Sequence, residues 1–369
     1  MTTSALRISR AILLGLAVSA SVTLIVDADQ PTLAQHAVSA AQAFEKGGYL
    51  IRNNQLTEGL QWLDKAAQLG HADAAFELGS LYEAGLGVPK DYDRAKTYYD
   101  LAVAKGHRNA HFNLALLLNN GQVPFSDLQQ SRELMQVVAQ QGDIEAQYVL
   151  ATLLESALHT VEAQPAQSVL WLQRAANKGH GKAQLMLGMH YLKGRHLARN
   201  PAIAHDLLSR SANQGISGAQ FNLALMYERG DGIAADTAKA LRWYESAAAS
   251  GNANAQQNLG IKYLVGEELA ANTPKALDLL SRAATAGLRN SQFLLGQLYQ
   301  SGYEGKVVVD LAKAERWYLR AAKQGQTEAQ YQLALMLLEK QNGAQRAQFW
   351  IEQAVAAGHE GAIKLKAKL

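Results

Sequence analysis

The chain has 369 residues, of which 48% are hydrophobic and 18% are charged, a balance that excludes a wholly disordered protein. It contains no cysteine, so it cannot form a disulfide-stapled scaffold, a zinc-thiolate site or a thiol nucleophile. The net charge of +3 is too small to favour a nucleic-acid partner, which requires clustered lysine and arginine.

The first 28 residues have the order of a secretory signal peptide. Arg7 and Arg10 precede an uncharged apolar run over residues 11–26, which ends at Val26-Asp27-Ala28. Sixteen apolar residues are short for a membrane span, which needs about 20. We therefore expect residues 1–28 to be removed and the chain to be periplasmic or secreted, with no stable membrane span. A retained N-terminal anchor is the alternative.

Residues 29–369 consist of one repeated unit. A segment of the type Ala-Ala-x-x-Gly recurs at intervals of 33 to 38 residues. Its glycines are Gly70, Gly106, Gly142, Gly179, Gly215, Gly251, Gly287, Gly325 and Gly358. Periods of this length indicate stacked helix pairs, because each pair can bury its apolar side only against its neighbours.

Each unit predicts a first helix, a glycine-rich loop and a second helix. Small, aliphatic and aromatic residues recur four apart on the first helix, as Ala219, Leu223 and Tyr227 do. The glycine that closes each unit supplies the left-handed turn that stops the second helix. Second helices begin at predicted caps, some of which precede proline. These caps are Asp91, Asp127, Asn200, Asp236, Thr273 and Asp310.

The repeated pattern is similar to that of a known family. The units read Gly-x-x-x-Ala-Gln-x-x-Leu-Gly-x-x-Tyr, then Gly-x-Gly-Val-x-x-Asp, then Lys-Ala-x-x-Trp-Tyr-x-x-Ala-Ala, and they resemble Sel1-like repeats, relatives of tetratricopeptide repeats. The resemblance covers residues 36–369, although the loop glycines are replaced in the unit after Gly142. It implies an all-α fold, a right-handed superhelix of about nine helix pairs whose first helices line a concave surface.

The residue pattern predicts no catalytic residue, cofactor or metal site. The five tryptophans share one position of the unit, where other units carry tyrosine or leucine, which indicates packing. Four histidines follow a unit glycine, and His107 and His111 lack a third metal ligand. Neither a phosphate-binding motif nor a hydrolase motif is present. We therefore expect a protein that is not an enzyme.

The polar side of the first helices is the candidate partner-binding surface. Positions −1, 3 and 10, counted from the small residue that opens each first helix, lie outside its packing side. Amide side chains there can donate to and accept from the backbone of an extended peptide. The candidates are Asn109, Asn113, Lys182, Asn222, Arg229, Asn254, Asn258, Asn290 and Gln332. Alternatively, the asparagines at position 3 bond to a neighbouring repeat or to water.

Taken together, these features favour a non-enzymatic scaffold or adaptor of the bacterial cell envelope that binds a protein or peptide partner. The resemblance implies this role, since proteins with similar repeats serve as adaptors in several envelope processes. Binding of envelope carbohydrate or peptidoglycan is one alternative, although the polar side is rich in amides and poor in aromatic rings. Cell-wall or beta-lactam chemistry is another, but the branch linked to it depends on cysteines that this chain lacks. The sequence does not specify the partner, the process or the oligomeric state.

Overall fold

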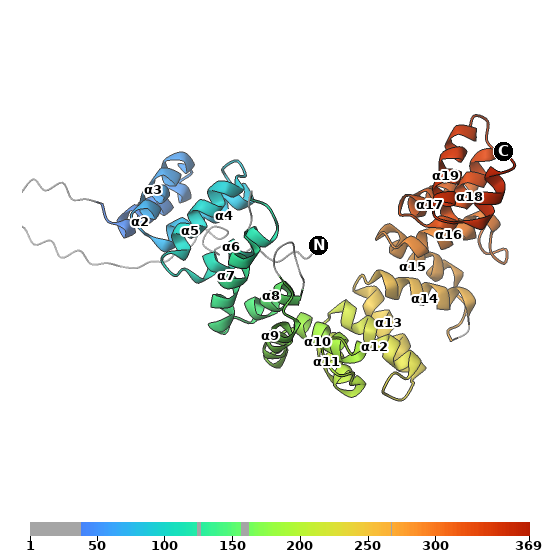
Figure 1. Cartoon of the computed structure of the whole chain (residues 1–369), viewed down its shortest axis with the longest axis horizontal. Coiled ribbons are helices and arrows are strands. Elements are labelled where there is room, and N and C mark those ends of the chain that lie inside the picture. The colour runs from blue at the N-terminus through green and yellow to red at the C-terminus, as the bar shows by residue number, and fades with distance from the viewer. Residues whose placement is uncertain (1–37, 124–126, 156–161, 267) are drawn as a thin grey trace, which may run out of the picture. The chain divides into compact units, whose positions relative to one another are not determined.

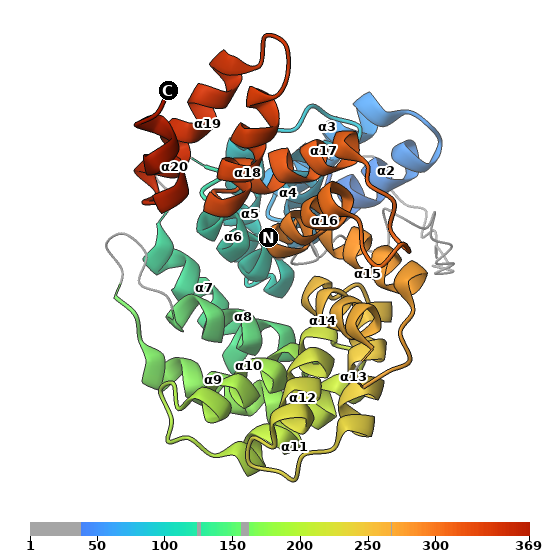
Figure 2. The same cartoon turned by 90° about the vertical axis from the view of Figure 1, so that its right-hand side faces the viewer.

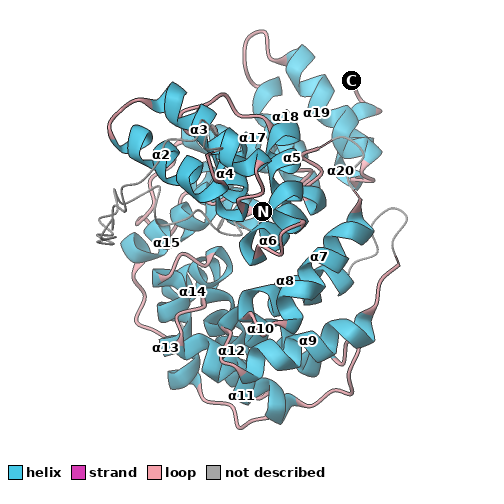
Figure 3. Cartoon of the chain, turned by 90° about the vertical axis from the view of Figure 1, so that its left-hand side faces the viewer, coloured by secondary structure: helices cyan, strands magenta, loops and turns pink. Residues whose placement is uncertain are grey.

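The computed structural model describes residues 38–123, 127–155, 162–266 and 268–369. The expected signal peptide and the replaced loop at residues 156–160 lie outside these ranges. The described residues form helices α2 to α20 and no strand, apart from an isolated bridge between Tyr303 and Val307. Figure 3 shows the resulting fold, in which helices alternate with short loops. The prediction of an all-α fold is confirmed.

The chain divides into two compact units, one ending at Lys178 and the other comprising Gly179–Leu369. The first unit contains α2 (Ala40–Arg52), α3 (Leu56–Gln68), α4 (Ala72–Ala84), α5 (Tyr92–Val103), α6 (Arg108–Asn119), α7 (Leu128–Gln140), α8 (Ile144–Glu155) and α9 (Pro165–Asn177) (Figure 1). The second contains α10 (Gly181–Lys193), α11 (Pro201–Asn213), α12 (Ser217–Arg229), α13 (Thr237–Ala249), α14 (Ala253–Val265), α15 (Thr273–Thr285), α16 (Arg289–Ser301), α17 (Leu311–Lys323), α18 (Thr327–Leu338), α19 (Ala344–Ala356) and α20 (Glu360–Lys366) (Figure 2).

Within each unit, every helix packs against the helix before it and the helix after it in sequence. The first helix of a pair packs most closely against its own second helix, as α4 does against α5 and α14 against α15. The second helix then packs against the first helix of the next pair, as α13 does against α14. The predicted stack of helix pairs is therefore present in both units.

The predicted helix caps are confirmed with one correction. Asp91, Asn200, Asp236 and Asp310 each accept a hydrogen bond from the backbone N–H three residues later, and Asp127 accepts from the N–H groups two and three residues later. The cap of α15 is Asn272, whose side chain accepts from the N–H of Lys275, whereas Thr273 is the buried first residue of the helix. Proline fits either of the first helical positions, so the Thr-Pro pair placed this cap one residue too late.

The glycines serve two different purposes in the array. All nine unit-closing glycines adopt positive φ angles between 75° and 96°, as predicted for left-handed turns. Gly79 and Gly296 instead lie inside first helices beneath the rings of Tyr99 and Tyr318. A Cβ atom at these glycines would lie 2.6 Å and 2.5 Å from a ring carbon, so glycine permits the close helix contact that we predicted.

In five repeats a buried glutamine at position 1 of the first helix joins the helix pair to the preceding one. Its Nε2 donates to a backbone carbonyl eight residues earlier, in the last turn of the preceding second helix. The bonds run from Gln147, Gln220, Gln256, Gln292 and Gln330 to Ala139, Ala212, Ala248, Ala284 and Ala322, over 2.8–3.3 Å. Each of these carbonyls also accepts from the backbone N–H of the unit-closing glycine, so the glutamine uses the second lone pair of the carbonyl oxygen and fixes one pair against the next.

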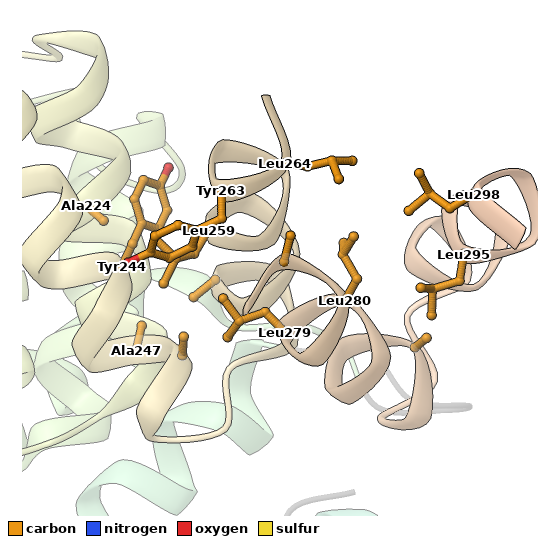
Figure 4. Close-up of a cluster of buried hydrophobic side chains, with 14 residues drawn as sticks. Ala224, Tyr244, Ala247, Leu259, Tyr263, Leu264, Leu279, Leu280, Leu295 and Leu298 are labelled. Atoms are coloured by element: carbon orange, nitrogen blue, oxygen red, sulfur yellow. The ribbon is translucent and has the colours of Figure 1, made fainter. Parts of the chain in front are cut away.

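The core of the second unit consists of clusters that are rich in alanine, leucine and tyrosine. One cluster of buried side chains extends from Ala224 on α12 to Leu298 on α16 (Figure 4). Tyr244 is the largest fully buried side chain in this cluster, and Trp243 and Trp317 pack on its edge. The small alanines let the helices approach closely, and the larger residues fill the space between them.

Candidate partner-binding face

Four of the nine candidate residues expose their side chains, all in the second unit. Lys182, Asn254 and Asn290 occupy position −1, in the first turn of α10, α14 and α16, and Arg229 is the last residue of α12. Position −1 of α12 is Gly218, which has no side chain to add to this row. We call Lys182, Arg229, Asn254 and Asn290 the first-helix face. Asn109, the corresponding residue of α6 in the first unit, is half-buried.

The residues at position 3 are buried more deeply than the sequence predicted. Asn113 is 0% exposed, and its Nδ2 donates to the hydroxyl of Tyr99 over 3.2 Å. Asn258 is half-buried, and its Nδ2 lies 3.4 Å from the hydroxyl of Tyr244. In both cases the tyrosine belongs to the preceding second helix. Asn113 therefore has no surface for a partner and is withdrawn from the candidate site.

Asn222 and Gln332 have bonding partners within their own helices. The Nδ2 of Asn222 donates to the carbonyl of Gly218 over 2.7 Å, and the Nε2 of Gln332 donates to Glu328 over 2.9 Å. The preceding second helix carries Leu208 at the repeat position that Tyr99 and Tyr244 occupy in their helices, so Asn222 has no tyrosine hydroxyl at that position. The polar residues at position 3 therefore do not form one uniform ladder of free amides.

The two tyrosine-bonded asparagines belong to a network that occurs twice. Tyr99 donates to Glu83 over 2.6 Å in the first unit, and Tyr244 donates to Glu228 over 2.7 Å in the second. Burial raises the pKa of Glu83, and the bond from Tyr99 only partly offsets this effect. Burial also acts to raise the pKa of Glu228, but bonds from Lys262 and Tyr244 outweigh it and lower the pKa.

Glu77 has a raised pKa that could not be predicted from the sequence. It occupies position 3 of α4, where burial and then the charge of Asp73 raise its pKa to about 7. The carboxyl of Glu77 therefore titrates much closer to neutral pH than an ordinary glutamate does. The only sequence signal is a glutamate at a position that carries asparagine in other units.

The histidines that follow unit glycines cap the first helices. The Nδ1 atoms of His71, His107, His180 and His359 accept from the N–H three residues later over 3.0–3.3 Å. The ring of His107 also stacks on Phe76 of the preceding first helix, and its Nε2 lies 3.1 Å from Asp73. A similar contact joins His359 to Tyr331 and Glu328. The repeat therefore explains these histidines structurally.

We predict that acidification weakens the cap formed by His107. Burial lowers the pKa of His107 below the usual value of about 6.5, with Asp73 opposing and His111 adding to this effect. The stabilisation by neutral His107 is therefore complete above a pH of about 6.5, the pKa of histidine in the unfolded chain. It is lost as the pH falls below that value, because the folded state binds fewer protons than the unfolded state. The His107→Asn variant should remove about 1 kcal/mol of the acid-induced loss between pH 7.5 and 5.5, measured by denaturant unfolding.

Asparagine is the appropriate replacement because the chain already uses it at this position. Asn252 caps α14, and its Oδ1 accepts from the N–H of Ala255 over 3.0 Å. The variant therefore keeps the cap while removing the titratable ring. An equal acid-induced loss in the two proteins would contradict the prediction.

The tryptophans lie on the second helices, where three of them are covered by cations. Lys46 and Lys65 approach the ring of Trp62, Arg174 lies 4.4 Å from the ring centroid of Trp171, and Arg320 covers Trp317 at 4.8 Å. Trp171 is buried and the others are half-buried. These contacts fit the packing role predicted for this position.

Within residues 38–123, 127–155, 162–266 and 268–369, no group of three or more histidine, aspartate and glutamate side chains is placed to hold a metal ion. None of the helices in those ranges combines the length and apolarity that crossing a membrane requires.

The helix pairs and their repeated connections define a repeat solenoid. Nine segments match the Sel1 repeat, so the chain belongs to the Sel1 repeat family, whose members are generally protein-interaction scaffolds. The matched segments are residues 32–71, 72–107, 108–143, 144–180, 181–216, 217–252, 253–288, 289–326 and 327–359. No curated protein matches the sequence.

Two solved structures are similar over most of their length. A Sel1 repeat protein from Oxalobacter formigenes is 30% identical with a TM-score of 0.70, over 79% of this chain and 85% of that chain. The protein c5321, a protective antigen present in uropathogenic Escherichia coli strains, is 29% identical with a TM-score of 0.64, over 88% of this chain and 70% of that chain.

Proposed function

We propose that the protein is a non-enzymatic adaptor of the bacterial cell envelope that holds an extended segment of a partner protein on its first-helix face. The observation that carries the proposal is the recurrence of exposed polar side chains at one position of three first helices, α10, α14 and α16, at Lys182, Asn254 and Asn290. The intervening α12 carries Gly218 at this position, so the row has one gap, and its repeated spacing suits a partner whose backbone also repeats.

The chemistry of this face favours an extended chain over a compact ligand. The amides of Asn254 and Asn290 can each donate to a carbonyl and accept from an N–H of a peptide backbone. Lys182 and Arg229 add positive charge, which favours a segment carrying acidic side chains and gives it an orientation. Export is supported by residues 1–28, whose order is that of a signal peptide.

The proposal predicts that the double variant Asn254→Ala/Asn290→Ala captures its partner at least tenfold less well. Both side chains are exposed, so the melting temperature should change little. A photo-crosslinking residue at Lys182 in intact cells, followed by mass spectrometry, identifies the adduct, and its yield is then compared between the parent and the double variant.

The matched control is Asn177→Ala/Asn213→Ala. These two exposed asparagines end the second helices α9 and α11, away from the first-helix positions. The control should retain the adduct in full. An undiminished adduct in the Asn254/Asn290 variant would remove the first-helix face from the proposal.

A further inference from the structure

In several units, the side chain of the residue before the unit glycine donates a hydrogen bond to a residue about 30 to 36 positions earlier in the chain. In the loop after α11, the Nε2 of Gln214 donates to the carbonyl of Gly179 over 3.0 Å and to the Oε1 of Gln184 over 2.8 Å. After α17, the Nε2 of Gln324 donates to the Oε1 of Gln292 over 2.8 Å. These two closing glutamines supply a donor to the buried glutamine at position 1 of the first helix in the same pair.

The pair α14 and α15 lacks this donor. Its closing residue is Ala286, whose methyl group cannot form the bond. The two oxygens that Gln214 contacts in its own repeat correspond here to the carbonyl of Gly251 and the Oε1 of Gln256. In the described part of the chain, no donor lies within hydrogen-bond distance of either oxygen.

A cavity of about 490 Å³ lies at this place. Gly251 and Gln256 line it on one side, and Ser281, Arg282, Thr285 and Ala286 of the α15 end line it on the other. Gln256 is only 3% exposed and uses its Nε2 to bond Ala248, whereas its Oε1 is accessible from the open cavity and accepts no hydrogen bond from the described residues.

Three other repeats lack the donor but differ in access. Their closing residues are Lys178, Ser250 and Ala357, and the Oε1 atoms of Gln147, Gln220 and Gln330 are buried without a hydrogen-bond partner. The Oε1 of Gln256 is not fully buried, and its residue lines an open cavity. The α15 repeat is therefore where an outside group can supply the missing donor.

The walls of the cavity select the chemistry of that group. The guanidinium of Arg282 donates to Ala248 over 3.3 Å and lies 3.8 Å from the carboxylate of Asp278, and its side chain remains 47% exposed. A second cation is disfavoured beside it, whereas an oxygen atom could accept from its remaining N–H groups. A primary carboxamide offers two hydrogens for the two unsatisfied oxygens and one oxygen for Arg282 or the neighbouring hydroxyls.

We propose that the cavity beside Ala286 binds the side-chain carboxamide of a glutamine from a partner protein. The incoming amide takes the place that Gln214 and Gln324 fill from within the chain in their own repeats. This site lies on the α15 end and the turn between α13 and α14, and it does not depend on the first-helix face carrying a partner.

The test uses the full chain and the capped peptide acetyl-Gly-Gln-Gly-N-methylamide, which carries one primary carboxamide. In a titration of protein labelled at its alanine and threonine methyl groups, the NMR signals of Ala286 and Thr285 should shift saturably. Peptides with glutamate, leucine or lysine in place of glutamine should bind at least tenfold more weakly. Equal binding of any of these three would overturn the carboxamide assignment.

Two variants of the closing position complete the test. Ala286→Gln should fill the cavity from within, raise the melting temperature and weaken peptide binding at least tenfold. Gln324→Ala should open an equivalent cavity beside Gln292 and add a second binding event, which keeps the test independent of the folding of the first variant. No shift with the parent protein, or unchanged binding by Ala286→Gln, would show that the cavity holds only water.

Discussion

Replacing Tyr244 by alanine is expected to lower the free energy of unfolding by about 3–5 kcal/mol, the range found for removing a buried aromatic ring. The ring is 0% exposed and lies in the core cluster that extends from α12 to α16 (Figure 4). Its hydroxyl also donates to Glu228 and lies next to Asn258. Chemical denaturation followed by circular dichroism measures the loss.

Two further substitutions separate the contributions of the ring and the hydroxyl. Tyr244→Phe keeps the ring and should cost about 1–3 kcal/mol, because it leaves a buried polar group of the network without its partner. Tyr49→Ala is the control, since Tyr49 is 60% exposed and its loss should change stability by less than about 0.5 kcal/mol. A loss below 1 kcal/mol for Tyr244→Ala would mean that the α12 to α16 layer tolerates a cavity.

Replacing Arg132 by methionine is the second large effect that we expect, at about 2–6 kcal/mol. Arg132 on α7 is buried, and its guanidinium donates to the carbonyl of Leu153 over 2.8 Å and to that of Glu162 over 2.7 Å. Methionine fills the space but leaves both carbonyls without this donor, at about 1–3 kcal/mol each. The loss is measured by chemical denaturation, and hydrogen exchange should rise in the last turn of α8.

The matched control for Arg132 is Arg174→Met. Arg174 lies on the next second helix, α9, where it is exposed and covers the ring of Trp171. Its loss should cost less than about 1 kcal/mol, because exposed cation-π contacts contribute little. Equal losses for the two arginines would show that the carbonyl bonds of Arg132 do not hold the end of α8.

The position of Arg132 illustrates how the array accommodates a departure from its repeat. The unit after Gly142 has lost the loop glycines that end first helices elsewhere, such as Gly85 and Gly194, which adopt left-handed conformations as C-caps. In this unit the guanidinium of Arg132 instead bonds to a carbonyl in the last turn of α8. The sequence showed that the glycines were missing. It could not show that a side chain from another helix, Arg132 of α7, bonds to the end of α8 in their place, because a local pattern does not identify contacts between helices.

The exposure of the candidate residues was predicted only in part. The repeat phase placed Lys182, Asn254 and Asn290 on the polar side of their helices, where their side chains are exposed. It could not show that Asn113 is fully buried, because this depends on Tyr99 reaching it from the preceding second helix. The raised pKa of Glu77 likewise depends on burial, which position along a helix does not determine.

The sequence by itself determined the repeat, the order of helix pairs and nearly every cap of the second helices, because periodicity, capping and left-handed turns involve residues within a few positions of one another. Only the tertiary structure decided which polar groups are satisfied. The alanine at position 286, among the closing glutamines Gln214 and Gln324, is visible in the sequence. It leaves two oxygens beside an open cavity without a donor from the described residues only when helices separated by a full repeat are brought together, since hydrogen bonds depend on distances between atoms and not on residue type.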